Sequence, residues 1–166
     1  MGKLVNITTA LHESTNRDFL ARMVDDKVHC MKLAKQYGKD YWDGDRRYGY
    51  GGYKYMPGRW KPVAEELIKI YNLKSDSKVL DIGCGKGYLL HEMKLLIPDL
   101  DIVGIDSSDY GLENAKEEIK PFIHKHKAEV KLPYKDKEFD LVISLGTFHN
   151  LRLLELKIAL SEMERV

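Results

Sequence analysis

The residues best suited to hold a ligand follow directly after a predicted buried strand over 78–82. Gly83, Gly85 and Gly87 end this strand and lead into a predicted helix that begins at about Tyr88. Glycines allow a sharp turn and leave no Cβ atoms between the backbone and a ligand. The free N–H groups of the helix would point to the same place. The pattern therefore predicts a site for something small and polar.

The residue that narrows the choice of ligand is Asp81, two positions ahead of the first glycine. Dinucleotide-binding turns have the spacing G-x-G-x-x-G, whereas this chain has G-x-G-x-G, with the small residue Cys84 inside the turn. An acid at this place would repel a pyrophosphate and attract an ammonium or sulfonium group. The spacing thus favours a cationic ligand over NAD, and a corner that binds nothing is the plain alternative.

A second acid, Asp106, ends a predicted apolar strand over 101–106. It lies roughly 20 residues beyond the glycines, where a carboxylate can accept hydrogen bonds from both ribose hydroxyls. This position supports nucleoside binding without naming the ligand, and a simple turn acid is the alternative. Ser107 and Ser108 are suited to cap a helix over 111–119.

Three motifs occur in a fixed order: Val79-Leu-Asp-Ile-Gly-Cys-Gly-Lys-Gly87, Val103-Gly-Ile-Asp-Ser-Ser108, and Leu132-Pro-Tyr followed by Phe139-Asp-Leu-Val142. Together they resemble the class I S-adenosylmethionine-dependent methyltransferases. The resemblance covers roughly residues 74–166 and implies that S-adenosylmethionine is the cofactor, with S-adenosylhomocysteine as the product.

The resemblance also implies which residues bind the cofactor: Asp81, Gly83, Cys84, Gly85, Gly87, Asp106, Ser107, Ala128, Glu129, Leu145 and Gly146. The glycine turn would pass under the methionine part, Asp81 would attract its amino group, and Asp106 would hold the ribose. Residues 128–129 would border the adenine and 145–146 would flank the sulfonium. Lys127-Ala128-Glu129 departs from the usual G-D-A of the family. The acid that meets the adenine amine is therefore either Glu129, displaced by one position, or absent.

The implied fold is a Rossmann-like three-layer α/β/α sandwich with a mainly parallel sheet. We expect strands at about 78–82, 101–106, 126–130 and 139–145, in the order 3-2-1-4. The family's strands 5, 7 and 6 would follow only after Val166, which would leave strand four as an exposed edge. We therefore expect the front part of a longer protein, or one whose remainder a partner supplies.

The chain divides into an N-terminal helical region over 1–71 and a cofactor-binding domain over 72–166. Apolar periodicity predicts helices over 14–38 and 59–73, and a last amphipathic helix over 151–166. In this last helix the apolar stripe is expected to comprise Leu153, Leu156, Leu160 and Met163.

A loop over 41–60 contains five of the ten tyrosines, five glycines and three arginines. Glycine at this density disfavours regular structure, so aromatic packing must hold the loop. We expect it to close over the cofactor and to recognise a hydroxylated or anionic acceptor with four of its residues: Tyr50, Tyr53, Arg59 and Trp60. Two alternatives are a surface or homodimer contact through the N-terminal region, and stacking on nucleobases.

The predicted loop after strand four contains His149, the candidate general base. The alternative is that the enzyme acts by proximity and orientation alone. His124 and His126 lack further ligands of the kind that metals need, so no metal is expected.

The composition agrees with a cytoplasmic enzyme. The net charge is +1, which gives no broad footprint for nucleic acid, and the two cysteines are far apart in the sequence. No stretch is apolar enough to span a membrane. We predict methyl transfer to an O, N or C nucleophile of a small-molecule acceptor such as a sugar or an acidic metabolite. The alternatives are an RNA-directed methyltransferase, an NAD-dependent enzyme and a non-catalytic cofactor-binding module.

Overall fold

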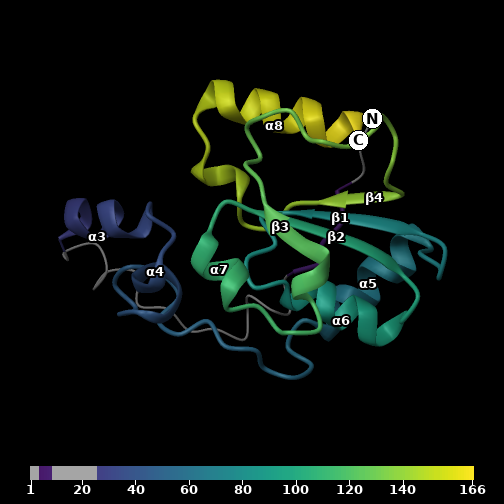
Figure 1. Ribbon diagram of the computed structural model, residues 1–166, viewed down its shortest axis with the longest axis horizontal. Helices are drawn as coiled ribbons and strands as arrows, with labels where there is room; N and C mark the ends of the chain where they lie inside the picture. The colour runs from purple at the N-terminus through teal and green to yellow at the C-terminus, as the bar shows by residue number, and fades with distance from the viewer. Residues whose placement is uncertain (1–3, 9–25) are drawn as a thin grey trace.

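A four-stranded parallel sheet forms the centre of the computed structural model, which describes residues 4–8 and 26–166. Its strands are β1 (Lys78–Ile82), β2 (Asp101–Asp106), β3 (Ile123–Lys125) and β4 (Leu141–Ile143), in the order β3-β2-β1-β4 (Figure 1). This is the predicted order, and it confirms the Rossmann-like fold.

Helices form a layer on each face of the sheet, and other helices lie to one side of it (Figure 1). The described helices are α3 (Lys27–Ala34), α4 (Lys39–Asp43), α5 (Lys61–Tyr71), α6 (Tyr88–Leu96), α7 (Asp109–Glu113) and α8 (Leu153–Arg165), with 3-10 turns at Lys120–Phe122 and Phe148–Asn150. Figure 1 shows α8 on one face of the sheet and α5 and α6 on the other, with α3 and α4 to one side. Among the described residues, no helix has the length and apolar character needed to cross a membrane.

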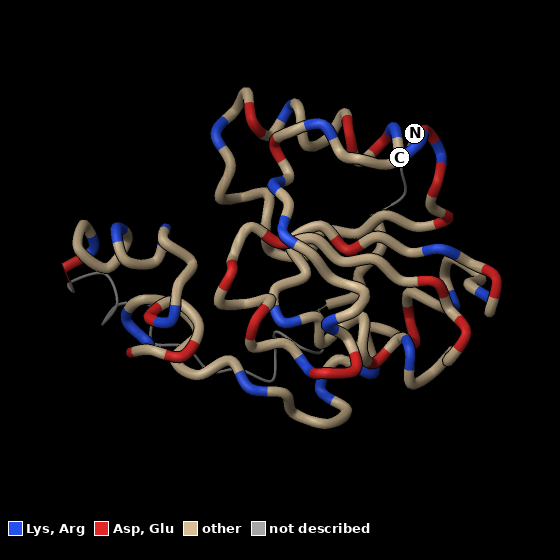
Figure 2. Tube along the Cα trace, viewed as in Figure 1, with Lys and Arg blue, Asp and Glu red and all other residues tan. Residues whose placement is uncertain are grey.

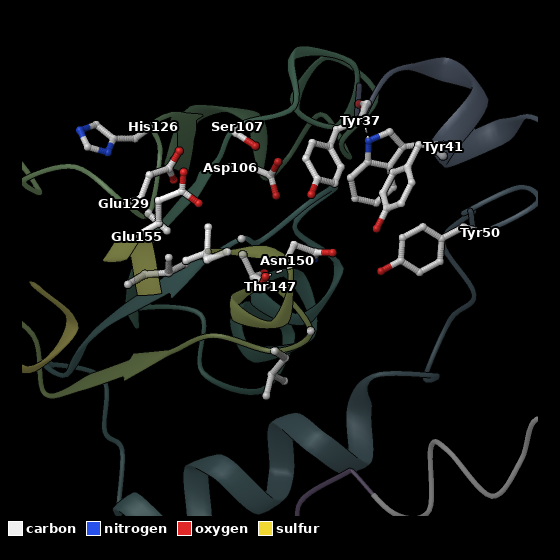
Figure 3. Close-up of a pocket in the computed structure, with 17 residues that line it drawn as sticks. Tyr37, Tyr41, Tyr50, Asp106, Ser107, His126, Glu129, Thr147, Asn150 and Glu155 are labelled. Carbon is white, nitrogen blue, oxygen red and sulfur yellow. Dashed lines mark hydrogen bonds between the residues drawn. The ribbon is translucent and has the colours of Figure 1, made fainter. Parts of the chain in front are cut away.

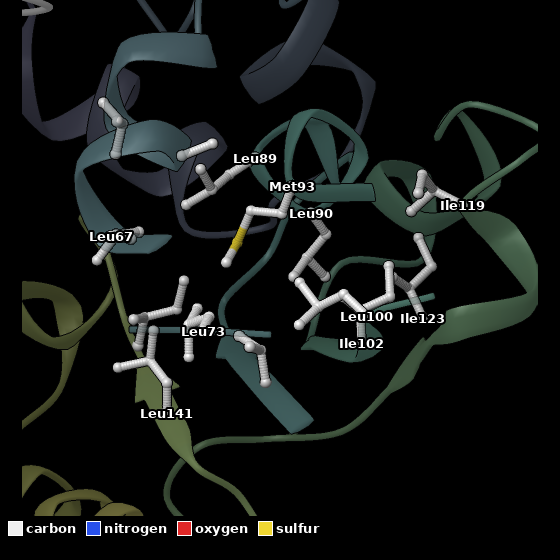
Figure 4. Packing of buried hydrophobic residues seen from close by; sticks show 14 of the residues in the cluster. Leu67, Leu73, Leu89, Leu90, Met93, Leu100, Ile102, Ile119, Ile123 and Leu141 are labelled. Atoms are coloured by element: carbon white, nitrogen blue, oxygen red, sulfur yellow. The ribbon is translucent and has the colours of Figure 1, made fainter. Parts of the chain in front are cut away.

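Two apolar clusters join these layers. The larger one fills the space between the sheet and the α5–α6 pair, around Leu67, Leu90, Met93 and Ile102 (Figure 4). The smaller one lies under α8 and contains Leu80, Ile82, Ile105, Ala128, Leu132, Ala159 and Val166. Both faces of β1 are buried, so its residues Val79, Leu80 and Ile82 pack on one side or the other, as in parallel strands generally, and Asp81 is a buried exception.

The register of the sheet brings the two acids of the sequence motifs to one edge. Ile82 pairs with Ile105, so the glycine turn after β1 begins beside the end of β2. Gly83 N–H and Cys84 N–H both donate to the Ile105 carbonyl oxygen, at 2.7 and 3.0 Å. The turn is thereby fixed next to Asp106, the last residue of β2.

The third strand is the clearest error of the sequence-based prediction. It was expected at 126–130 but lies at Ile123–Lys125, where Ile123 pairs with Gly104 and Lys125 with Asp106. Since β2 ends at Asp106, later residues have no neighbouring strand to pair with. Residues 126–130 instead cross the carboxyl edge of the sheet, where the site is.

Three other elements also differ from expectation. The helix predicted over 111–119 is α7, which Ser108 caps by accepting from Gly111 N–H at 2.9 Å and which already ends at Glu113. The fourth strand is shorter than predicted, and α4 occupies the start of the loop over 41–60. Residues 14–25 of the predicted N-terminal helix lie outside the described part of the chain.

Helix α8 is present, and only part of the predicted apolar stripe packs on the core: Met163 lies against the smaller cluster, whereas Leu160 is 50% exposed. Leu153 is 82% exposed, whereas Ala159 is 1% exposed and touches the sheet side of the smaller cluster. The small side chain at this position allows a close approach. Glu162 also accepts a hydrogen bond from Leu132 N–H at 2.7 Å, which sets the rotation of the helix.

Candidate active site

The glycine turn is shaped by contacts that exclude side chains. Gly83 and Gly85 have φ values of 84° and 57°, in the region that favours glycine. A Cβ atom at Gly83 would lie 1.9 Å from Thr147 Oγ1, and one at Gly85 would lie 2.7 Å from Trp42 Cη2. The turn therefore has no room for larger residues at these two positions.

Asp106 ties the glycine turn to the loop after β2. Its Oδ2 accepts from Gly85 N–H and its Oδ1 accepts from Ser108 N–H, both at 2.8 Å. Burial raises the pKa of the Asp106 carboxyl, although the backbone hydrogen bonds act in the opposite direction. The carboxylate faces a cavity, as Figure 3 shows, and remains able to accept further hydrogen bonds.

Asp81 is a buried acid without a cationic partner. Its side chain is 5% exposed, and burial together with the negative charge of Asp106 raises its pKa to about 7. Among the described residues, none donates a hydrogen bond to the Asp81 carboxylate or pairs with it. It lines a small cavity of about 60 Å³ beside Gly83 and Gly85. A buried carboxylate facing a cavity in this way is suited to bind a cation.

Three cavities meet at the carboxyl edge of the sheet. The first, of about 200 Å³, is lined by Tyr37, Tyr41, Trp42, Tyr50, Ile82, Gly83, Asp106, Ser107, His126, Ala128, Glu129, Leu145, Gly146, Thr147, Asn150, Leu151 and Glu155. Figure 3 shows the tyrosines at one end of this cavity and Glu129 and Glu155 at the other.

The second cavity, of about 500 Å³, is lined by Thr8, Arg46, Tyr50, Gly52, Tyr53, Lys54, Met56, Arg59, Trp60, Tyr88, Ser144, Leu145 and Gly146. The small cavity at Asp81 shares Tyr50 and Leu145 with both larger ones. These two residues therefore stand where the three spaces meet.

The aromatic segment over 41–60 is attached to the loop after β2 and to the glycine turn after β1. Trp42 is buried, and its Nε1–H donates to Ser108 Oγ at 2.8 Å and to the Tyr37 carbonyl oxygen at 3.1 Å. The rings of Trp42 and Tyr50 stack with centroids 5.2 Å apart. The segment thus packs as a wall of the site.

A buried ion pair makes the second attachment. Lys86 lies inside the G-x-G-x-G turn, is 4% exposed, and its Nζ donates to the Asp43 carboxylate at 2.8 and 3.0 Å. The same ammonium donates to the Tyr53 carbonyl oxygen at 2.8 Å, and Tyr110 OH donates to Asp43. Burial raises the pKa of Asp43, but the hydrogen bonds from Lys86 and Tyr110 outweigh it and hold the pKa below its ordinary value.

The structure brings nearly all predicted site residues to these cavities. Gly83, Asp106, Ser107, Ala128, Glu129, Leu145 and Gly146 line the first cavity, and Asp81, Cys84 and Gly85 line the small one. Tyr50, Tyr53, Arg59 and Trp60 line the second cavity. Gly87 lines none of the three and instead begins α6 in a left-handed conformation. Their roles stay predictions.

His149, the predicted general base, is not brought together with the others. It lies exposed in the 3-10 turn Phe148–Asn150 and lines none of the three cavities. Its neighbours Thr147 and Asn150 line the first cavity in its place.

Several residues of the site were missed from the sequence. Lys86 occupies a variable position of the glycine motif, and Trp42 was one aromatic among many, so neither carried a distinguishing signal. Glu155 lies in the first turn of α8, where it accepts from Arg152 N–H at 2.8 Å and also lines the first cavity. Among the described residues, no group of three or more His, Cys, Asp or Glu side chains is arranged to hold a metal ion.

Comparison with known proteins identifies the class to which this fold and site belong. A family model described as a methyltransferase domain matches residues 73–166. The chain therefore belongs to this methyltransferase family, and its fold is that of the class I S-adenosylmethionine-dependent enzymes, as the motifs predicted.

Individual relatives match only part of their own length. The chain is 31% identical over 124 residues to a demethylmenaquinone methyltransferase of Thermotoga maritima, covering 75% of this chain and 51% of the relative. It is 31% identical over 90 residues to a ribosomal RNA small subunit methyltransferase C of Buchnera aphidicola, covering 51% and 25%. A crystal structure of a S-adenosylmethionine-dependent methyltransferase from Aquifex aeolicus is similar with a TM-score of 0.53 at 27% identity, covering 67% and 62%. The chain thus spans 51% of the length of the Thermotoga relative and 25% of the length of the Buchnera relative.

Proposed function

We propose that this chain binds S-adenosylmethionine at the carboxyl edge of its sheet and transfers the methyl group to an O, N or C nucleophile of a small-molecule acceptor. The observation that carries the proposal is the buried Asp81 carboxylate, which faces a cavity beside the glycine turn and has no partner among the described residues. An ammonium group is the partner that such a carboxylate requires.

The residues present fit the cofactor. Asp81 would bind the amino group, the Cβ-free surface of Gly83 and Gly85 would border the methionine part, and Asp106 would accept from the ribose hydroxyls. Glu129 is the acid available to the adenine amine at the far end of the first cavity. When bound, S-adenosylmethionine supplies a methyl group on a positively charged sulfur.

The remaining chemistry is positioning by this chain's own residues. Tyr50 and Leu145 stand between the first and second cavities, so the acceptor would approach the cofactor past them. Neither a carboxylate nor an imidazole among the described residues lines the second cavity. We therefore assign catalysis to proximity, orientation and exclusion of water, and His149 has no place in the proposed mechanism.

The acceptor is proposed to be a small molecule because the second cavity is enclosed by the aromatic segment. The relatives include a demethylmenaquinone methyltransferase and a ribosomal RNA methyltransferase, so they do not decide between a small molecule and RNA. Figure 2 shows Lys and Arg interspersed with Asp and Glu along the described chain, which does not favour a nucleic-acid surface. In the same proposal, residues 1–71 form the lid region and residues 72–166 form the cofactor-binding domain. We also propose that the protein acts in the cytoplasm. A homodimer contact through the N-terminal region stays a prediction.

Calorimetry with S-adenosylhomocysteine and, separately, with NAD tests the proposal. We expect S-adenosylhomocysteine to bind and NAD not to bind. Asp81→Asn and Asp106→Ala should each weaken the affinity by about tenfold or more, as expected for a buried charged contact. Asp99→Asn, an exposed acid in the turn before β2, is the matched control and should change nothing.

Two outcomes would contradict the proposal. One is tighter binding of NAD than of S-adenosylhomocysteine. The other is an affinity for S-adenosylhomocysteine that both active-site variants leave unchanged. Binding without methyl transfer to any acceptor tested would instead favour the non-catalytic module.

A further inference from the structure

The second cavity has a one-sided charge. Arg46, Lys54 and Arg59 contribute to its lining, and none of the lining residues identified among the described part of the chain is acidic. All three cations come from the aromatic segment over 41–60, so one segment supplies the charge of the whole cavity. A cavity with this lining disfavours a cationic acceptor and attracts an anionic one.

The charged and aromatic residues occupy different depths. Lys54 and Arg59 are exposed, whereas Tyr53 and Trp60 are partly buried and Tyr88 is 6% exposed. The cations therefore mark the outer part of the cavity, and the aromatic rings mark the inner part. Flat aromatic walls of this kind fit a planar or unsaturated body better than a bulky one.

Two of the three cations, Lys54 and Arg59, carry charge that no described acid balances. Lys54 and Arg59 have no ion pair with any acid among the described residues, although Arg59 approaches the Met56 sulfur at 4.0 Å. Glu92, the buried acid that binds the same segment, accepts from Tyr55 OH at 2.9 Å and Gly58 N–H at 3.0 Å and does not line the cavity. This contrasts with Lys86, whose charge Asp43 balances.

Ser144, Leu145 and Gly146, just after β4, also contribute to the lining of the second cavity. Leu145 and Gly146 line the first cavity as well, so this part of the lining adjoins the proposed cofactor site. The nucleophile of an acceptor must therefore lie beside these residues.

We propose that the acceptor is a small planar molecule that carries a carboxylate or phosphate at one end and the methylated nucleophile at the other. Lys54 and Arg59 bind the anionic group, the tyrosine and tryptophan rings hold the planar body, and the nucleophile reaches the end of β4. This inference rests on the proposed function, because it assigns the second cavity to the acceptor of the same reaction.

A series of probes of equal shape and different charge tests the inference. The probes are para-hydroxyphenylacetate, its neutral amide, and tyramine as the cation, with phenyl phosphate as the second anion. Each is titrated into the full chain with and without saturating S-adenosylhomocysteine. We expect para-hydroxyphenylacetate to bind about tenfold more tightly than its amide, with tyramine weakest. The better of the two anions identifies carboxylate or phosphate as the preferred group.

The variant for this test is the double substitution Lys54→Gln with Arg59→Gln. It should remove the preference for the anion while leaving the affinity for S-adenosylhomocysteine unchanged, because neither residue lines the first cavity or the small one. Lys69→Gln with Lys74→Gln removes two exposed cations outside the three cavities, so this double variant is the matched control for net charge and should keep the preference.

Equal affinities for the three charge forms, or tighter binding of tyramine, would overturn the inference. So would a failure of both anions to bind, or an anion preference that survives in the double variant. Since S-adenosylhomocysteine is titrated on the same samples, failure of the cofactor proposal is distinguishable from failure of the acceptor proposal.

Discussion

Lys86 Nζ lies 2.8 Å from Asp43 Oδ2, and this ion pair joins the glycine turn of the proposed cofactor site to the aromatic segment that lines the proposed acceptor cavity. The two residues are 43 positions apart in the sequence. Because Lys86 is nearly fully buried, any movement of the segment must either break this pair or move the turn with it. The contact therefore couples the two halves of the site.

A double-mutant cycle with Asp43→Asn and Lys86→Met measures this coupling. We expect an interaction energy of about 1–3 kcal/mol in the free energy of unfolding, because a buried charge left without its partner is costly. The exposed pair Lys61–Glu65, at 3.7 Å, is the control and should give roughly 0.3–0.5 kcal/mol. Urea unfolding of the wild-type chain and of the six variants of the two cycles gives both values, and a coupling no larger than the control would contradict the assignment.

Gly85→Ala should disturb the site more than its backbone conformation alone explains. The new methyl group would meet the Trp42 ring at 2.7 Å, whereas at Gly58, which also has a positive φ of 74°, it would meet nothing within 4 Å. Gly58→Ala should therefore cost only the strain of the left-handed conformation, about 1 kcal/mol. We expect Gly85→Ala to cost about 1–2 kcal/mol more and to weaken binding of S-adenosylhomocysteine. Equal losses in the two variants would show that Trp42 does not restrict the turn.

The affinity for S-adenosylhomocysteine should depend on the ionisation of Asp81. The pKa of this carboxyl is about 7 in the unliganded chain, and only the ionised form attracts an ammonium group. Below pH 7 the carboxyl must lose a proton before it can bind the ammonium group. The affinity for S-adenosylhomocysteine should therefore fall by up to about tenfold for each pH unit. Calorimetry between pH 5.5 and pH 8.5, roughly one to two units on either side of the pKa, checks this. Asp81→Asn should lose the dependence, and a flat profile in the wild-type chain would contradict it.

The same residue should lower the stability of the unliganded chain. An acid whose pKa is raised on folding, here from 3.8 to about 7, binds its proton more tightly in the folded state. The stability it contributes is therefore present at low pH and is lost as the pH rises through about 7. Since one pKa unit is worth about 1.4 kcal/mol, Asp81→Asn should raise the free energy of unfolding at pH 8 by up to about 4 kcal/mol.

Urea unfolding without ligand, at low and at high pH, tests this second role of Asp81. The gain from Asp81→Asn should grow from about 2 kcal/mol near pH 5 to about 4 kcal/mol near pH 8, because the loss of stability accumulates between the unfolded pKa of 3.8 and the folded pKa of about 7. Asp99→Asn should have no such pH dependence. A variant that is less stable than the wild-type chain at the higher pH would mean that the Asp81 carboxylate has a stabilising partner.

The central strands and the glycine turn could be predicted because their signals are local. A nearly continuous apolar run marks a strand buried on both faces, and three alternate glycines directly after it mark a turn that leaves the backbone exposed. The third strand was misplaced because its position depends on its neighbour. Asp106 ends β2, and pairing cannot continue beyond it, which no property of residues 126–130 reveals.

Helix α8 illustrates the same limit. Of the predicted stripe Leu153, Leu156, Leu160 and Met163, only Met163 packs against the smaller cluster, and the fully buried contacts are made by Ala159 and Val166. The hydrogen bond from Leu132 N–H to Glu162 fixes the rotation of the helix, and it joins segments 30 residues apart. A periodicity argument has no access to such a contact.

The sequence by itself determined the family, the order of the sheet and the two acids that line the cavities, because neighbouring residues produce the turn and parallel strands end at one edge. Only the tertiary structure decided that Trp42 binds Ser108, that Lys86 binds Asp43 and that His149 lies outside the cavities. These relations depend on how a glycine-rich segment folds back over distant loops. The course of this segment is decided by which of its polar groups become buried and with which distant residues they pair. Both depend on the packing of the whole chain.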